Sequence, residues 1–458
     1  MPARNRSVPR FRPSLSFILL AVLLGVLWLA GGASRADAFG QVVVRSAAWT
    51  ALIAAVLFGE RPVLGQARPV ALLLLAALAL ALLQLIPLPP DIWQALPGRA
   101  PFKEAAAASG QAQPWRPWSI VPGATVNAAS SLIVPFVVLV LLTGLKEAER
   151  GWLPGLVLCL VALSMLVGLL QFSGVGFNNP LINDPLGEVG GTFANRNHFA
   201  LFLAFGCLLA PAWAFLGGRR PHWRGPVALG LVLLFALTIL ATGSRAGLLL
   251  GAIALGIGLV LVRQGIRRML DRYPRWAFPA LIAGIVGVVA LFVLISVAAD
   301  RAASIDRAFA AGQDMRTRGL PTVLDMVETY FPVGSGLGGF DPIFRMHEPF
   351  DLLKLTYFNH AHNDLLEIVL DAGLPGLLLL LAGLSWWGWA SVRAWRAGSG
   401  TRHALPKLGS AMLLLVIIAS AFDYPARTPM IMAMIVVAGA WLSGRTDERS
   451  ASALPTGD

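Results

Sequence analysis

Long apolar segments constrain what this chain can fold into more than any other feature of its sequence. A helix rises about 1.5 Å per residue, so roughly 20 apolar residues cross a hydrocarbon core about 30 Å thick. The pattern predicts an all-α, polytopic transmembrane helical bundle of about 12 spans. The segments lie at residues 15–31, 41–59, 69–87, 126–145, 152–172, 198–217, 226–242, 248–262, 277–299, 365–392, 408–422 and 429–444.

The overall composition excludes several other classes of protein. Apolar residues make up 57% of the chain and charged residues 13%, whereas an ordinary soluble domain has about 45–50% and about 25%. A soluble globular enzyme and a disordered chain are therefore excluded. The two cysteines, Cys159 and Cys207, lie within apolar segments, so we expect neither a disulfide framework nor a zinc site.

The distribution of Lys and Arg orients the spans. With the N-terminus inside, 22 of the 36 Lys and Arg residues fall on the inner side, and the outer segments are close to neutral. The positive-inside rule then places both termini in the cytoplasm. The net charge of +12 is thus explained by topology, and we expect no nucleic-acid partner. The first span, with its arginine-rich flank, also fits a cleavable signal, but further spans follow at once and favour a retained helix.

This topology divides the chain into four parts. Residues 1–299 hold the first nine predicted spans with short loops, 300–361 form a large outer loop, 362–444 hold the last three spans, and 445–458 form an inner tail. The outer loop is too long to be a mere connector. It contains two apolar patterns at helical spacing, which predict amphipathic helices that form either a lid over a lipid-facing cleft or a packing cap. The patterns comprise Leu320, Val323, Leu324 and Val327, then Phe350, Leu353, Tyr357 and Phe358.

The first candidate site is a short turn between two predicted spans. Residues 242–247 have the sequence TGSRAG, and an ionisable residue near the apolar core is a functional candidate by default. The guanidinium of Arg245 suits a phosphate or pyrophosphate, which it can bind through two hydrogen bonds. The alternative is an arginine that extends from a helix end to the membrane surface without a further role.

A second polar segment leads into the sixth predicted span. Residues 190–198 have the sequence GGTFANRNH, and Arg196 is a second cation on the outer side. The asparagines of this segment can cap the helix. We expect His198, at the start of the helix, to be structural rather than catalytic.

The third candidate lies where the outer loop re-enters the membrane, at residues 359–364 with the sequence NHAHND. The cationic form of a histidine at a helix N-terminus is disfavoured, so His362 can act as a general base near neutral pH. Asn363 can cap the helix and help to orient the histidine.

Three acidic residues follow this histidine at helical spacing. Asp364, Glu367 and Asp371 are three and four residues apart and share one helix face. They could orient His362 or relay its proton. Alternatively, this turn protrudes into solvent, because residues 374–392 alone are long enough to span the membrane.

No pattern in the sequence predicts a metal or cofactor site. His360 and His362 could supply half of a metal site, but no cysteine or acidic cluster clearly completes it. No two aspartates are spaced as Asp-x-Asp, and the glycine-rich segment 334–339 lacks the strand and helix of a dinucleotide-binding unit. We therefore expect no metal and no cofactor.

Taken together, these motifs resemble the O-antigen ligase and polymerase superfamily. The resemblance rests on their order and sidedness over roughly residues 150–440, because each motif is short. The matching elements are Gly191-Thr192-Phe193 with Asn195-Arg196-Asn197-His198, Thr242-Gly243-Ser244-Arg245-Ala246-Gly247, Phe331-Pro332 with Gly334, Gly336 and Gly338, and His360-Ala361-His362-Asn363 with Gly373 and Gly376.

The resemblance implies a glycan transferase of the bacterial inner membrane whose active site faces the periplasm, so that the outer loop is periplasmic. Its donor would be an undecaprenyl-pyrophosphate-linked glycan, and its acceptor lipid A–core in a ligase. Arg196 and Arg245 would bind the pyrophosphate, His362 would activate the acceptor hydroxyl, and Arg316 or Arg318 would add a donor contact.

Other functions remain open at this point. In a polymerase of the same superfamily the acceptor would be a second lipid-linked glycan, and some relatives glycosylate protein. A membrane transporter also fits the number of spans, but transporters usually carry inverted repeats and place ionisable residues near the bilayer midplane. We find no such repeat, and the polar residues gather at the outer helix ends.

Overall fold

A computed structural model of the chain describes residues 13–175, 178–182, 187–216, 221–270, scattered positions between 274 and 294, and residues 315–353, 358–398 and 403–444. Almost all regular structure in these residues is helical, as the sequence predicts. The helices are α1 (Leu15–Ala30), α2 (Phe39–Phe58), η1 (Gly65–Ala67), α3 (Arg68–Leu83), α4 (Pro90–Ala95), α5 (Ala100–Ala108), α6 (Pro122–Ser131), α7 (Ile133–Thr143), α8 (Glu147–Arg150), α9 (Leu153–Phe172), α10 (Arg196–Leu216), α11 (Arg224–Ala241), α12 (Arg245–Leu270), α14 (Met315–Tyr330), α15 (Phe340–His347), η2 (Phe350–Leu352), α16 (Asp364–Arg396), α17 (Ala404–Ser420), η4 (Pro425–Arg427) and α18 (Pro429–Ser443).

The apolar helices confirm a polytopic helical membrane protein. Among the described residues, 8 helical stretches are long and apolar enough to cross a membrane, and the shorter apolar helices α1, α17 and α18 join them. Each overlaps a segment predicted from the sequence. The remaining prediction, at 277–299, falls largely outside the described residues, as does the predicted inner tail at 445–458.

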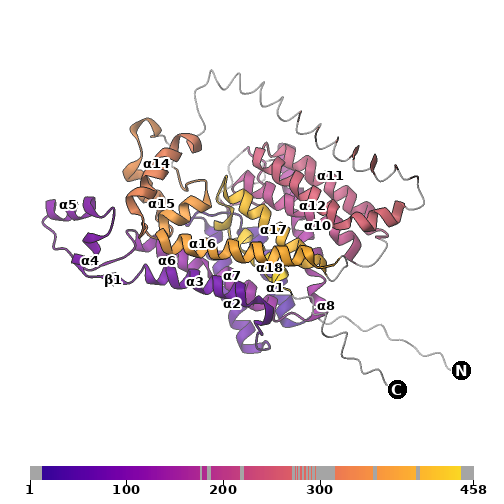
Figure 1. Cartoon of the computed structure of the whole chain (residues 1–458), viewed down its shortest axis with the longest axis horizontal. Helices are drawn as coiled ribbons and strands as arrows, with labels where there is room; N and C mark the ends of the chain where they lie inside the picture. The colour runs from indigo at the N-terminus through magenta and orange to yellow at the C-terminus, as the bar shows by residue number, and fades with distance from the viewer. Residues whose placement is uncertain are drawn as a thin grey trace.

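Helix α10 forms the centre of the bundle. Its span is 78% buried, the largest fraction among the candidate spans of the described chain. Small residues allow α12 to lie directly beside it: a side chain added at Gly247 would meet Ala200, and one added at Gly258 would meet the backbone of Cys207. Figure 1 shows α10, α11 and α12 grouped on one side of the bundle, with α1, α2, α3 and α7 on the other.

A second, smaller apolar core lies at the end of the bundle that carries α14 and α15 (Figure 1). Helix α14 contributes Val323, Met326 and Tyr330 to this core, but Leu320 and Leu324 of the predicted apolar pattern are exposed. Within the second predicted pattern the structure describes only the short turn η2 and its neighbours, because residues 354–357 lie outside the described part. The segment between α3 and α6 covers this core, and its two strands, β1 (Pro87–Leu88) and β2 (Arg116–Pro117), pair antiparallel.

A break divides α16 into a short first part and a long second part. Gly373 has φ +56° and ψ −143°, a conformation that side chains rarely tolerate. The carbonyl of Pro332 accepts a hydrogen bond from the N–H of Leu374 (2.8 Å) and would collide with a side chain at Gly373. The glycine-rich loop after α14 is therefore packed directly on the break.

Two buried polar side chains fasten this glycine-rich loop. Gln84 donates to the carbonyl of Asp371 (3.0 Å) and accepts from the N–H of Leu337 (2.8 Å). Arg99 donates to the carbonyls of Trp118 and Gly334, each at 3.0 Å. Burial lowers the pKa of Arg99 to about 10, so it remains a cation at neutral pH. The segment between α3 and α6, the glycine-rich loop and the start of α16 thus form one connected unit.

Candidate functional site

His362 lies in the turn that leads into α16. Its φ of +50° is uncommon for a residue other than glycine, so the surrounding contacts must hold it. Asn363 supplies one of them as the N-cap: its side chain accepts from the N–H of Leu366 (3.1 Å) and donates to the carbonyl of Ala421 (3.2 Å). The turn is thereby attached to the segment after α17.

The carboxylate beside His362 belongs to Asp423. The Nδ1 atom of His362 lies 3.1 Å from Oδ1 of Asp423, and 15% of the histidine side chain is exposed. A carboxylate only accepts hydrogen bonds, so we assign the proton to Nδ1, which leaves the lone pair of Nε2 available. The histidine therefore has both an orienting partner and an exposed face.

Asp423 also joins the turn to the start of α10. Its Oδ2 accepts from the amides of Asn195 (3.0 Å) and Asn197 (2.6 Å). Asn197 in turn accepts from the hydroxyl of Ser244 (2.7 Å). We call His362, Asp423, Asn195, Asn197 and Ser244 the His362 cluster. Through it, three sequence motifs that are far apart in the chain meet at one place.

Arg196 and Arg245 flank this cluster. They are the first residues of α10 and α12, whose N-terminal ends are tied together by the Ser244–Asn197 hydrogen bond. Both arginines are exposed. A side chain added at Gly243, in the turn before Arg245, would lie 3.9 Å from Nη1 of Arg196. Two guanidinium groups beside two helix N-termini form a site suited to an anion.

The three acidic residues that follow His362 point into the protein and surround Arg427. Asp364, Glu367 and Asp371 are each at most 2% exposed. Their oxygens lie 3.2, 3.2 and 3.7 Å, respectively, from nitrogens of Arg427. The alternative in which this turn protrudes into solvent is therefore wrong, because η4 supplies a cation against the acidic face of α16.

Glu367 also holds the other histidine of the motif. Its Oε1 lies 2.9 Å from Nδ1 of His360, and its Oε2 accepts from the N–H of Ala361 (2.8 Å). We call Arg427, Asp364, Glu367, Asp371 and His360 the Arg427 cluster. Burial alone would lower the pKa of Arg427, but the three carboxylates outweigh burial and raise it.

Tyr424 separates the two clusters. Its ring centroid lies 4.3 Å from that of His360, 5.0 Å from that of His362 and 5.1 Å from that of His198. His198 is buried, and its Nδ1 lies 2.9 Å from the hydroxyl of Thr428. The two histidines of the His-x-His motif thus face different carboxylates. Within the described residues, no group of three His, Cys, Asp or Glu side chains is placed to hold a metal ion.

Arg318, the predicted loop contact for a donor, lies on α14. It donates to the side chain of Asp351 (2.6 Å) and to the Asp351 carbonyl (3.2 Å). The next residue, Gly319, lies against Phe358, whose ring is 5.0 Å from that of His362. The N-terminal end of α14 is thus one aromatic residue away from the histidine. The side chain of Arg316 lies outside the described part.

Sequence reasoning missed Asp423, Tyr424 and Arg427. These residues occupy a short segment between two apolar spans, and ionisable residues in such positions are candidates on general grounds. That rule alone could have identified Asp423 and Arg427. It could not have assigned Asp423 to His362 and Arg427 to the acidic face of α16, since both partners are about 60 residues away in the chain.

Comparisons with known proteins show which family this chain resembles. Residues 229–381 match the model of the family described as O-Antigen ligase, and the match includes Arg245, Arg318 and His362. The chain is 24% identical over 276 residues to the Exopolysaccharide production protein ExoQ of Rhizobium meliloti (strain 1021). The similar stretch covers 57% of this chain and 59% of that protein, so it spans less than two thirds of the relative. These comparisons confirm the resemblance of this chain to the O-antigen ligase and polymerase superfamily.

Proposed function

We propose that this chain transfers a glycan from an undecaprenyl-pyrophosphate donor to an acceptor hydroxyl at the periplasmic face of the bacterial inner membrane. One observation carries the proposal: a continuous set of hydrogen bonds joins His362, through Asp423 and Asn197, to the turn that bears Arg245. A base and two cations are thereby gathered at one end of the bundle. Glycan transfer from a pyrophosphate can use this combination, with the base for the acceptor hydroxyl and the cations for the leaving group.

His362 acts as the general base in this proposal. With Nδ1–H directed to Asp423, Nε2 accepts the proton of the acceptor hydroxyl while the hydroxyl oxygen attacks the anomeric carbon. Asp423 holds the ring in one tautomer and stabilises the imidazolium that forms. Asn363 and the two asparagines on Asp423 keep this geometry fixed in the absence of substrate.

Arg196 and Arg245 bind the leaving group. As the bond between the anomeric carbon and the pyrophosphate oxygen breaks, negative charge grows on undecaprenyl pyrophosphate, and fixed guanidinium groups stabilise that charge. Attack from the side opposite the leaving group inverts the anomeric centre. The acceptor proton ends on His362, so charge and atoms balance without a metal or cofactor.

The acceptor in this proposal is lipid A–core, in agreement with the family description of O-Antigen ligase. The rhizobial relative is named for exopolysaccharide production, which favours a second candidate in which the acceptor is another lipid-linked glycan. The same base and cations serve both reactions. The difference lies in the molecule that presents its hydroxyl to His362.

A transfer assay with both acceptors tests the proposal. Purified protein in lipid would receive an undecaprenyl-pyrophosphate glycan with lipid A–core, in the presence of EDTA, and the products would be resolved on a gel. Glycan on lipid A–core would support the ligase, and a ladder of longer lipid-linked glycans the polymerase. Failure of folded protein to transfer to either acceptor would contradict the proposal and favour a protein acceptor or a transporter.

A further inference from the structure

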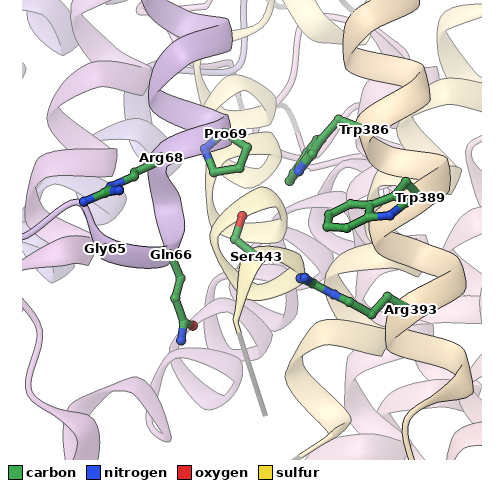
Figure 2. A pocket seen from close by; sticks show the side chains of 8 residues that line it. All are labelled: Gly65, Gln66, Arg68, Pro69, Trp386, Trp389, Arg393 and Ser443. Atoms are coloured by element: carbon green, nitrogen blue, oxygen red, sulfur yellow. The ribbon is translucent and has the colours of Figure 1, made fainter. Parts of the chain in front are cut away.

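A pocket opens at the C-terminal end of α16. The candidate active site lies at the other end of this helix. Its water-accessible volume is about 410 Å³. Figure 2 shows Trp386, Trp389 and Arg393 on one wall, contributed by α16, and the start of α3 on the opposite wall. Ser443, at the end of α18, lies between the two walls. Helices α3, α16 and α18, from distant parts of the chain, therefore line the pocket.

The pocket is basic and aromatic. The guanidinium of Arg393 lies 4.6 Å from the ring centroid of Trp389, and in Figure 2 its side chain extends toward Ser443. Arg68 lines the opposite wall, with its side chain directed outward, and Gln66 lies beside it. No acidic residue lines the pocket, and among the described residues neither arginine forms an ion pair with a carboxylate. An anion would therefore meet positive charge on both sides.

The position of the pocket favours an anion that is part of a lipid. Exposed leucines follow Arg68 along α3, at Leu72 and Leu75, and precede Trp386 along α16, at Leu378 and Leu381. Tryptophan is enriched at membrane–water interfaces, and basic pockets between helices on the cytoplasmic side bind anionic headgroups. The second part of α16 carries Arg393 twenty residues beyond Gly373, or roughly 30 Å along the helix. This pocket is thus distinct from the His362 cluster and, by the positive-inside rule, borders the inner leaflet.

We propose that this pocket binds the phosphate headgroup of an anionic phospholipid from the cytoplasmic leaflet. The phosphate contacts Arg393 and the acyl chains lie along the exposed leucines of α3 and α16. Arg68 can turn toward the phosphate from the opposite rim. The interaction is independent of the transfer reaction, since no residue of the pocket belongs to the candidate active site.

Native mass spectrometry of the full chain tests this site. The purified protein would be titrated with phosphatidylglycerol, phosphatidylcholine or inorganic phosphate. We expect phosphatidylglycerol to bind at least several-fold more tightly than phosphatidylcholine, and Arg393→Gln to weaken it about tenfold, because a charge-assisted hydrogen bond to phosphate is lost. Adding Arg68→Gln should weaken it further. Arg268→Gln is the matched control, since Arg268 is an exposed arginine near the end of α12 that does not line the pocket.

Each result has a definite meaning. Selective phosphatidylglycerol binding that falls in Arg393→Gln and is kept in Arg268→Gln, with unchanged melting temperatures, supports the proposal. Equal binding of the two lipids, or wild-type binding by Arg393→Gln, overturns it. An equal loss in Arg268→Gln also overturns it, because general surface charge would then explain the binding. Displacement of phosphatidylglycerol by an equal concentration of inorganic phosphate would identify a free-anion site instead of a lipid site.

Discussion

The His362 cluster and the Arg427 cluster share two segments of the chain, yet they differ in the charges that they contain and in what lies beside them. Both combine the start of α16 with the segment that follows α17. In the Arg427 cluster the three carboxylates are at most 2% exposed, and each lies near the same guanidinium. The histidines of the two clusters, His360 and His362, are equally exposed, at 15% of the side chain. Of the two clusters, only the His362 cluster is hydrogen-bonded to the helix ends that carry the exposed Arg196 and Arg245.

Under the proposed function, this difference assigns a structural role to the Arg427 cluster and a chemical role to the His362 cluster. Charges removed from water are tolerated when they are paired, and removal of one partner leaves the others uncompensated. The Arg427 cluster fits that description and holds the turn that carries His362. A base must instead reach its substrate, and of the two partly exposed histidines only His362 belongs to the cluster that is joined to the turn before Arg245 and to the start of α10. Substitutions in the two clusters should therefore fail in different ways.

The largest effect on turnover is expected at His362. His362→Gln removes the base but keeps a polar side chain of similar size, so we expect a loss of about 100- to 10,000-fold in kcat with an unchanged melting temperature. Asp423→Asn should reduce kcat in the same direction, because the tautomer of the histidine is no longer fixed. Steady-state transfer rates measured at equal amounts of folded protein provide the check. A His362→Gln enzyme with wild-type turnover would remove the base assignment.

The largest effect on stability is expected at Arg427. Arg427→Gln leaves three buried carboxylates without their cation, and we expect a loss of about 3–5 kcal/mol in the free energy of unfolding. Arg345→Gln is the matched control, since its pair with Asp341 is half-exposed and four residues apart, which is worth about 0.3–0.5 kcal/mol. Denaturant unfolding in detergent measures both. Equal stability of the two variants would show that the buried cluster is not what holds the turn.

A smaller effect is expected at the two flanking arginines. Arg196→Gln and Arg245→Gln should each lower kcat/KM about tenfold, because each removes a charge-assisted contact to the pyrophosphate. Both side chains are exposed, so their loss should leave the melting temperature almost unchanged. Transfer rates at several donor concentrations test this prediction. An Arg245→Gln enzyme with full activity would exclude Arg245 as a phosphate ligand.

The smallest effect is expected at the ion pair between α14 and η2. The Arg318–Asp351 pair is partly exposed, so its removal should cost at most about 1 kcal/mol of stability. If Arg318 also contacts the donor, Arg318→Gln lowers kcat/KM several-fold, whereas Asp351→Asn, which frees the arginine, does not. Equal activities of the two variants would reduce Arg318 to a structural role.

The sequence predicted more of the fold than of the site. Apolar segments such as 198–217 have one strong physical signal, the length needed to cross a membrane, and the helices follow it closely. The motifs around Arg196, Arg245 and His362 were also recognisable, because polar residues at outer helix ends are few. The pairing of charges was not recognisable. Asp364 and Glu367 were candidates to orient His362, whereas the structure places them against Arg427. Only the packing of η4 against α16 decides which carboxylate meets which cation.

A side-by-side assay of His362→Gln and Arg427→Gln tests the central claim most directly. Both variants and the wild type would be reconstituted in lipid with the undecaprenyl-pyrophosphate glycan and acceptor, and turnover would be normalised to the folded fraction. We predict that His362→Gln folds fully and scarcely turns over, whereas Arg427→Gln folds poorly and its folded fraction keeps most of its activity. The opposite pattern, an active His362→Gln and a stable but inactive Arg427→Gln, would contradict the assignment of chemistry to the first cluster and structure to the second.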